Sequence, residues 1–273
     1  MMPSRFRLCF VLALLMFGFP AFAGVETGKP TRVLFVGNSL TYVGNLPAVL
    51  EALATANGNS IESEMLVRGG ATLSDRARDG SVRKLLGTAR YDFVVLQERG
   101  GDVLCFNVDR VKHSVCESTQ AHLDLARIAA TRGARPIILG TYQEWEQASQ
   151  AIEGRERALA RTTGAVHIPV SERFRRLRAE SAAKNWFHED GMHPGHDLVL
   201  LEAIWLYREI FKSTPRPHDL VVTRPMFGPN ARFDGAVPAS AQSPAAAMKP
   251  YRYDQREVTE MIRSAIRTDP QVH

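Results

Sequence analysis

Two short polar segments contain residue types that catalyse acyl transfer. The first, residues 37–41 (GNSLT), follows an apolar run, so the Ser39 hydroxyl is expected at the carboxyl edge of a sheet, before the next helix. Backbone N–H groups and the helix dipole favour a developing oxyanion at such a place. The alternative is a turn in which Ser39 makes only local hydrogen bonds.

The second segment, residues 188–196 (HEDGMHPGH), places Asp190 three residues before His193. A serine nucleophile needs an imidazole base, and that base needs a carboxylate that fixes its tautomer. One alternative is a polar loop with helix-capping residues. Another is a metal site with four ligands: His188, Asp190, His193 and His196. No supporting Cys or carboxylate motif accompanies them, so we predict no metal.

Alternating strands and helices are expected to position these segments. A compact apolar run without two-residue alternation predicts a strand buried on both faces at 32–36, and a second buried strand is predicted at 92–96. Further strands are predicted at 61–67, 136–140 and 165–168. Helical spacing predicts helices between and after them, at 46–54, 82–86, 121–131, 151–162, from 171 and from 197. This order predicts a three-layer α/β/α sandwich with a mainly parallel five-stranded sheet, which binds ligands beyond the carboxyl ends of its strands.

The two segments on this α/β pattern resemble the SGNH, or GDSL-like, serine hydrolases. Residues 37–40 look like the family's nucleophile block, with Asn38 where many members have Asp, and residues 190–194 are similar to its DxxHP block. The resemblance implies the flavodoxin-like SGNH hydrolase fold and no cofactor. It also implies a catalytic triad: Ser39 as nucleophile, His193 as general base and then acid, and Asp190 as the orienting carboxylate.

The resemblance further implies an oxyanion hole of three donors. The first is the backbone N–H of Ser39, and the second is a glycine N–H after the second strand, assigned to Gly70 with Gly69 as the near alternative. The third is an Asn side chain in the family, but no GxND follows the third strand here. Gln97 ends that strand, as in some carbohydrate acetylesterase-like members, and its amide can donate the same hydrogen bond.

These assignments predict a serine hydrolase that cleaves carboxylic esters through an acyl-enzyme. The substrate is expected to be a small-molecule or carbohydrate ester, with deacetylation or deacylation of carbohydrate favoured by the resemblance around Gln97. Lipase or general carboxylesterase activity is one alternative. A non-catalytic exported binding module on the same fold is another, although such a module would not need all three triad residues.

The N-terminus predicts export. Residues 1–23 combine a basic start, about 12 apolar residues and an A-x-A end, which is typical of a signal peptide cleaved after Ala23; an uncleaved anchor is the alternative. We therefore expect a periplasmic or secreted protein without integral membrane association. Removing two Arg with this segment lowers the formal net charge from +5 to +3, too little and too scattered to indicate nucleic-acid binding.

The mature chain keeps two of the three cysteines. Cys105 and Cys116 are expected to form a disulfide in an oxidising compartment, with two free thiols as the alternative. The domain organisation predicted is a signal peptide at 1–23, an SGNH-like hydrolase domain at 31–212 and a Pro/Ala-rich extension at 213–273. Residues 236–248 of that extension indicate a linker or an extended wrap, and residues 253–266 a terminal helix.

Overall fold

The computed structural model describes residues 29–105, 116–181, 183–233, 235–238 and 250–269. The predicted signal peptide lies outside the described residues, as does most of the predicted linker. The six strands of the main sheet are β1 Thr31–Gly37, β2 Ile61–Val67, β3 Phe93–Leu96, β4 Arg135–Leu139, β5 Val166–Ile168 and β7 Gly235–Pro238. The helices are α1 Ser39–Tyr42, α2 Leu46–Ala56, α3 Leu73–Arg78, α4 Ser81–Thr88, α5 Glu117–Thr131, α6 Glu146–Thr163, α7 Ser171–Glu180, α8 His196–Phe211 and α9 Gln255–Thr268, with a 3₁₀ turn η1 at Gly100–Leu104.

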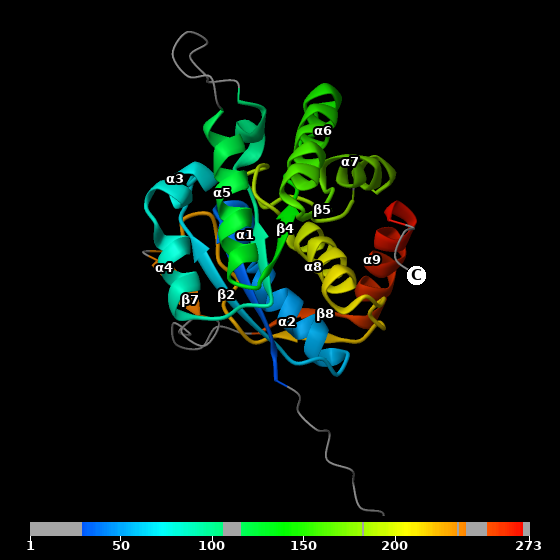
Figure 1. Ribbon diagram of the computed structural model, residues 1–273. Coiled ribbons are helices and arrows are strands. Elements are labelled where there is room, and N and C mark those ends of the chain that lie inside the picture. The colour runs from blue at the N-terminus through cyan, green and yellow to red at the C-terminus, as the bar shows by residue number, and fades with distance from the viewer. Residues whose placement is uncertain (1–28, 106–115, 182, 234, 239–249, 270–273) are drawn as a thin grey trace, which may run out of the picture.

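The main sheet has the strand order β5-β4-β3-β1-β2-β7 (Figure 1). Strands β1 to β5 are parallel and confirm the five predicted strands. The sixth strand, β7, was not predicted: it comes from the C-terminal extension and pairs antiparallel with β2. Because β1 is central, the loop that follows it lies near the middle of the sheet's carboxyl edge, where ligands bind in such folds.

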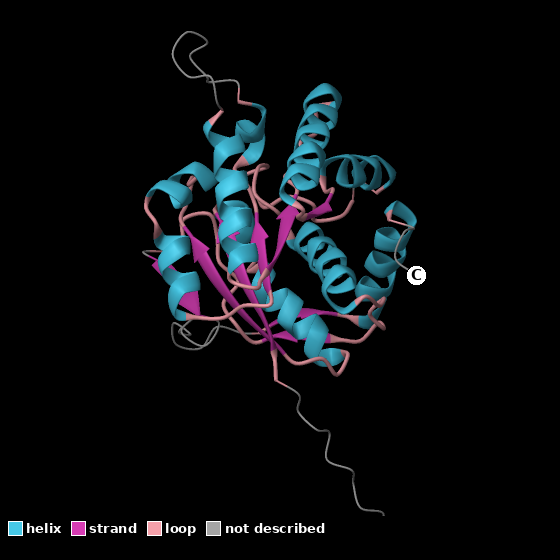
Figure 2. Ribbon diagram, viewed as in Figure 1, coloured by secondary structure: helices cyan, strands magenta, loops and turns pink. Residues whose placement is uncertain are grey.

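The apolar runs of the strands explain the three layers (Figure 2). Successive side chains of β1 point to opposite faces, so Val33 and Phe35 join one buried cluster while Leu34 and Val36 join another. The first cluster includes buried side chains of α2, α7, α8 and α9, and the second those of α3, α4 and α5. On the second face, α6 covers Ile138 of β4. Both faces are therefore covered, which confirms the predicted sandwich.

The C-terminal extension packs onto the first of these layers. Strands β6 (Leu220–Val222) and β8 (Tyr251–Tyr253) form a separate antiparallel pair, and α9 begins at an Asp254–Glu257 capping box. The apolar side of α9 is buried: Val258, Met261, Ile262 and Ala265. The buried Arg208 of α8 donates to the carbonyls of Ala265 and Asp269 at the other end of α9. No helix in the described part of the chain is long and apolar enough to cross a membrane.

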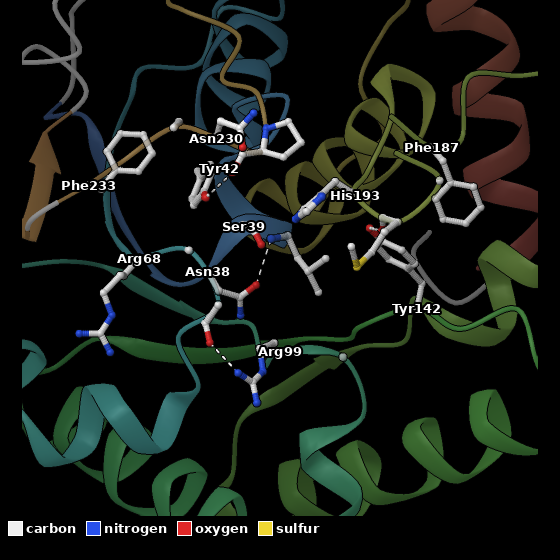
Figure 3. Close-up of a pocket in the computed structure, with 18 of the residues that line it drawn as sticks. Asn38, Ser39, Tyr42, Arg68, Arg99, Tyr142, Phe187, His193, Asn230 and Phe233 are labelled. Atoms are coloured by element: carbon white, nitrogen blue, oxygen red, sulfur yellow. Dashed lines mark hydrogen bonds between the residues drawn. The ribbon is translucent and has the colours of Figure 1, made fainter. Parts of the chain in front are cut away.

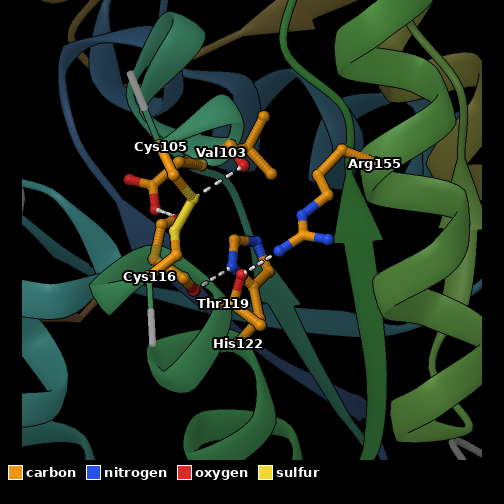
Figure 4. Close-up of a disulfide and its surroundings, with 8 residues drawn as sticks. Val103, Cys105, Cys116, Thr119, His122 and Arg155 are labelled. Carbon is orange, nitrogen blue, oxygen red and sulfur yellow. Dashed lines mark hydrogen bonds between the residues drawn. A yellow bond between two sulfur atoms is a disulfide. The ribbon is translucent and has the colours of Figure 1, made fainter. Parts of the chain in front are cut away.

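The predicted disulfide between Cys105 and Cys116 is present, with their Cα atoms 5.7 Å apart (Figure 4). Cys105 ends η1 and Cys116 directly precedes α5, so the bond ties the loop after β3 to the start of the next helix. The loop that it closes, residues 106–115, lies outside the described residues.

Candidate active site

Ser39 is the first residue of α1, two residues beyond the end of β1. Asn38 before it is fully buried: its side chain caps the helix by accepting from the Leu40 N–H at 3.0 Å, and it donates to the Gln97 carbonyl at 3.3 Å. A side chain on Gly37 would lie 2.3 Å from the Thr41 hydroxyl, so the close turn after β1 requires glycine there. These contacts fix Ser39 at the carboxyl edge of the central strand.

Asp190 and His193 form a hydrogen-bonded pair in the loop before α8. The Nδ1 of His193 lies 2.7 Å from Oδ2 of Asp190, while Oδ1 accepts from the backbone N–H groups of Met192 and His193 at 2.9 and 3.0 Å. Since an ionised carboxylate only accepts, Nδ1 carries the proton and Nε2 is left to act as a base.

The electrostatics of this pair keep Asp190 ionised. Partial burial raises the pKa of its carboxyl, but the two backbone N–H donors and His193 together lower it to about 2. The loop itself is anchored on both sides: the Tyr142 hydroxyl donates to the Met192 carbonyl at 2.9 Å, and the His188 N–H donates to the His193 carbonyl at 2.9 Å. The imidazole is therefore held in one orientation by side-chain and backbone contacts.

Ser39 and His193 line the same pocket, which has a volume of about 1060 Å³. Figure 3 shows the His193 ring extending toward Ser39, with Phe187 and Tyr142 on the far side of His193. The pocket lies at the carboxyl edge of the sheet, and residues 229–233 of the C-terminal extension form part of its wall. Its volume lies just above the usual range for ligand sites, about 300–1,000 Å³.

Gly70 also lines this pocket, and it has the positive φ of +68° that favours glycine. Its carbonyl accepts from Nη1 of Arg99 at 2.8 Å, and Arg99 is in turn paired with Asp102. Gly69 lies in the same turn, where a side chain would come within 2.9 Å of the Tyr42 hydroxyl. Position 69 therefore favours glycine because a side chain would crowd Tyr42, and position 70 favours glycine because of its positive φ.

Gln97 does not line this pocket. Its side chain is 1% exposed, and its Oε1 accepts from the Thr41 hydroxyl at 2.6 Å. Its Nε2 is buried and has no hydrogen-bond partner among the described residues. The neighbouring Glu98 is also buried and accepts from the N–H groups of Leu73 and Arg99 and from the Ser118 hydroxyl. The end of β3 therefore ties the site's loops together beneath the pocket.

The four residues considered as metal ligands are not arranged as one set. His196 stacks on Tyr251 with ring centroids 3.9 Å apart, whereas Asp190 is used by His193. His188 lies 3.8 Å from Asp190. Over the described ranges, no three His, Cys, Asp or Glu residues are grouped so that they could hold a metal ion.

Sequence patterns missed two parts of the pocket. One is the wall at residues 229–233, where Phe233 packs edge-on against Tyr42 with centroids 4.9 Å apart and the Tyr42 hydroxyl donates to the Pro229 carbonyl. The other is Arg99, which supports the Gly70 turn. The aromatic residues Phe227 and Phe233 in this Pro-rich segment were the available signal for the wall, since exposed linkers seldom contain them.

The sequence matches no family model and no curated protein. Solved structures do match its fold. A protein of the DUF4886 family from Bacteroides uniformis has a TM-score of 0.58 at 13% identity, over 89% of this chain and 96% of that one. An acetyl xylan esterase from Geobacillus stearothermophilus, in a single-residue variant, has a TM-score of 0.51 at 15% identity, over 67% and 95%.

A protein classed as a GDSL-like lipase, from Parabacteroides merdae, has a TM-score of 0.50 at 16% identity, over 68% of this chain and 97% of that one. The chain therefore has the fold of GDSL-like esterases and lipases. At the level of the fold, this confirms the resemblance to SGNH hydrolases that the sequence indicates.

Proposed function

We propose that this protein is an exported serine hydrolase that cleaves carboxylic esters through an acyl-enzyme, with Ser39, His193 and Asp190 as its triad. The observation that carries the proposal is the Asp190–His193 hydrogen bond of 2.7 Å beside the pocket that Ser39 also lines. The fold shared with esterases and lipases supports it. If Ser39 only made turn hydrogen bonds and residues 188–196 only capped a helix, nothing would require these segments, about 150 positions apart, to line the same pocket.

The chemistry follows from these positions. Nε2 of His193 takes the Ser39 proton as the hydroxyl oxygen attacks the ester carbonyl, and the Asp190 carboxylate stabilises the imidazolium that forms. The imidazolium then protonates the leaving alcohol, and water repeats the sequence on the acyl-enzyme to release the acid and restore Ser39. The low pKa of Asp190 keeps its carboxylate charged throughout.

The oxyanion is assigned to the backbone N–H groups of Ser39 and Gly70, both of which belong to residues that line the pocket. Arg99 donates a hydrogen bond to the Gly70 carbonyl and so orients the turn that carries one of these donors. The role of Gln97 as the third donor stays a prediction. For that role its side-chain amide, which is buried and bonded to Thr41, would have to extend into the pocket.

A fluorophosphonate probe tests the proposal, because it labels a serine only where that serine is activated as a nucleophile. The wild-type protein should be labelled and should hydrolyse 4-nitrophenyl acetate, while Ser39→Ala should lose the labelling and at least about 10³-fold of the rate. Ser60→Ala is the matched control, since Ser60 is exposed and its hydroxyl makes no described hydrogen bond. Full activity in Ser39→Ala would refute the triad; absent labelling in the wild type would favour the binding module.

For the substrate, we propose small acyl groups on carbohydrate. The similar acetyl xylan esterase supports this choice, as does Trp145, which lines the pocket and is 69% exposed, as a sugar-stacking residue would be. A panel of 4-nitrophenyl esters from acetate to long acyl chains, together with acetylated sugars, distinguishes this from lipase activity. The Cys105–Cys116 disulfide and the predicted signal peptide support export, which N-terminal sequencing of the secreted protein would test.

A further inference from the structure

Two of the three arginines that line the pocket come from segments far apart in the chain: Arg68 follows β2, and Arg232 belongs to the C-terminal extension. Figure 3 shows Arg68 on the opposite side of Ser39 from Phe187 and Tyr142. The Arg68 side chain is about half exposed, and Arg232 is exposed. Both arginines therefore line the pocket and expose their side chains to solvent.

The surroundings of Tyr42 bring these two segments together. Gly69, the neighbour of Arg68, lies so close to Tyr42 that a side chain on it would be 2.9 Å from the Tyr42 hydroxyl. Phe233, the neighbour of Arg232, packs on the Tyr42 ring. Burial raises the pKa of Tyr42, and the charge of Arg232 partly opposes that rise, which places this charge within electrostatic reach of the ring. The backbone segments that carry the two arginines therefore both lie against Tyr42, which also lines the pocket.

The other charged side chains on the pocket wall are already paired. Arg99 makes two hydrogen bonds with Asp102, and Glu144 forms an ion pair with Arg178.

Arg68 and Arg232, in contrast, are little neutralised. The nearest carboxylate to Arg68 is Asp75 at 3.7 Å, which is shared with Arg78 at 2.9 Å and with the cap of α3. Arg232 makes no ion pair with any described residue. Among the described residues, the positive charge of these two arginines is therefore largely uncompensated.

We propose that the pocket selects esters that carry an anionic group, such as a carboxylate, and that Arg68 and Arg232 bind this group while Ser39 attacks the ester carbonyl. This inference rests on the proposed hydrolase function and adds a substrate class to it. A guanidinium binds a carboxylate through charge-assisted hydrogen bonds, and a partly enclosed pocket strengthens their attraction relative to open solvent. The volume of about 1060 Å³ leaves room for such a group beside the reacting ester.

Two matched pairs of esters test the proposal, because the anion can belong to the acyl or to the alcohol part. 4-Nitrophenyl glutarate and valerate differ by one carboxylate on the acyl side. 4-Acetoxybenzoate and its methyl ester differ by one on the alcohol side. In at least one pair, Arg68→Gln/Arg232→Gln should lower kcat/KM for the anionic ester by about five- to tenfold and leave the neutral ester within twofold. Arg263→Gln, an exposed arginine of α9, is the control.

Binding to the Ser39→Ala protein provides a second readout that needs no hydrolysis. Calorimetry should show tighter binding of the anionic member of the responsive pair, with a preference that added salt and the double arginine variant both reduce. Equal effects of the double variant on anionic and neutral esters, with equal binding, would overturn the proposal even if Ser39-dependent hydrolysis is observed. If the wild-type protein hydrolyses none of these esters but still binds the anionic member more tightly, the hydrolase function is refuted and the anion-binding role of the two arginines is retained.

Discussion

At the scale of single residues, the site depends on a few buried polar contacts. The Asn38 side chain bonds to backbone groups at both of its polar atoms, whereas Asp190 accepts from backbone N–H groups at Oδ1 and from the His193 imidazole at Oδ2; these contacts position Ser39 and His193. Not every buried polar group is satisfied in this way. Glu202, in the middle of α8, is fully buried, and neither of its carboxylate oxygens has a partner among the described residues.

Glu202 makes a testable contribution to stability. Burial raises its pKa well above the ordinary value of 4.5, so the folded protein retains a proton that the unfolded chain releases. The folded state therefore loses stability as the pH rises above about 4.5, until the folded pKa is passed. Glu202→Gln keeps the shape and removes the titration, so it should raise the Tm more at pH 9 than at pH 5.

Thermal melts at pH 5, 7 and 9 measure this effect. Glu189→Gln is the control, because Glu189 is exposed in the loop before α8. If Glu202→Gln changes the Tm by the same amount at all three pH values, the pKa of Glu202 does not differ between the folded and unfolded states.

At the scale of elements, the loops at the carboxyl edge are held by links between neighbouring strands. The segment after β3 is the clearest case: Arg99 reaches the turn after β2, Glu98 reaches α3 and α5, and the disulfide joins η1 to α5. Without these links, the segment after β3 would be connected to the turn after β2, to α3 and to α5 only through the strands of the main sheet.

The disulfide is expected to stabilise the folded state mainly by restricting the unfolded chain. Closing a loop between residues 11 positions apart contributes about 2.5–3 kcal/mol in the loop-entropy model. The Cys105→Ser/Cys116→Ser protein should therefore unfold at a lower urea concentration, with a free energy of unfolding reduced by about that amount. Reductant should destabilise the wild type similarly and leave the double variant unchanged; equal stability of the two proteins under oxidising conditions would contradict the expectation.

At the scale of the whole molecule, the C-terminal extension completes both the core and the pocket. It adds β7 to the edge of the sheet, covers α8 with α9 and supplies the wall at residues 229–233. Such buried contacts are typical of part of a folded domain rather than of a flexible tether. The end of the hydrolase domain at residue 212 stays a prediction.

A chain that ends at residue 212 tests this role. Losing α9 leaves the apolar side of α8 in water, so the shortened protein should melt at least about 10 °C lower or fail to fold, and should bind a hydrophobic dye. A chain that ends at residue 269 is the control, because it keeps every described residue. An unchanged Tm for the shorter protein would show that the extension is only an appendage.

Much of the fold could be predicted from the sequence because its signals are local. The buried strands appear as apolar runs, and α2 begins at Leu46, where the helical spacing predicts it. Helices α5 and α6 begin four and five residues earlier than predicted, because their first turns are polar and lack the apolar spacing that was used to find them. Strand β7 was missed since a four-residue edge strand depends on its pairing with β2.

The sequence by itself determined the chemistry available at the site: a serine after the first strand, an Asp–x–x–His segment before the last core helix, and a glycine pair between them. The tertiary structure decided which of these residues share a pocket. It placed Ser39, Gly70, His193, Arg68 and Arg232 around one pocket, and it left Gln97 outside that pocket, hydrogen-bonded to Thr41. Sequence spacing cannot fix such a grouping, because it joins segments more than 150 residues apart whose proximity depends on how the sheet and the extension pack.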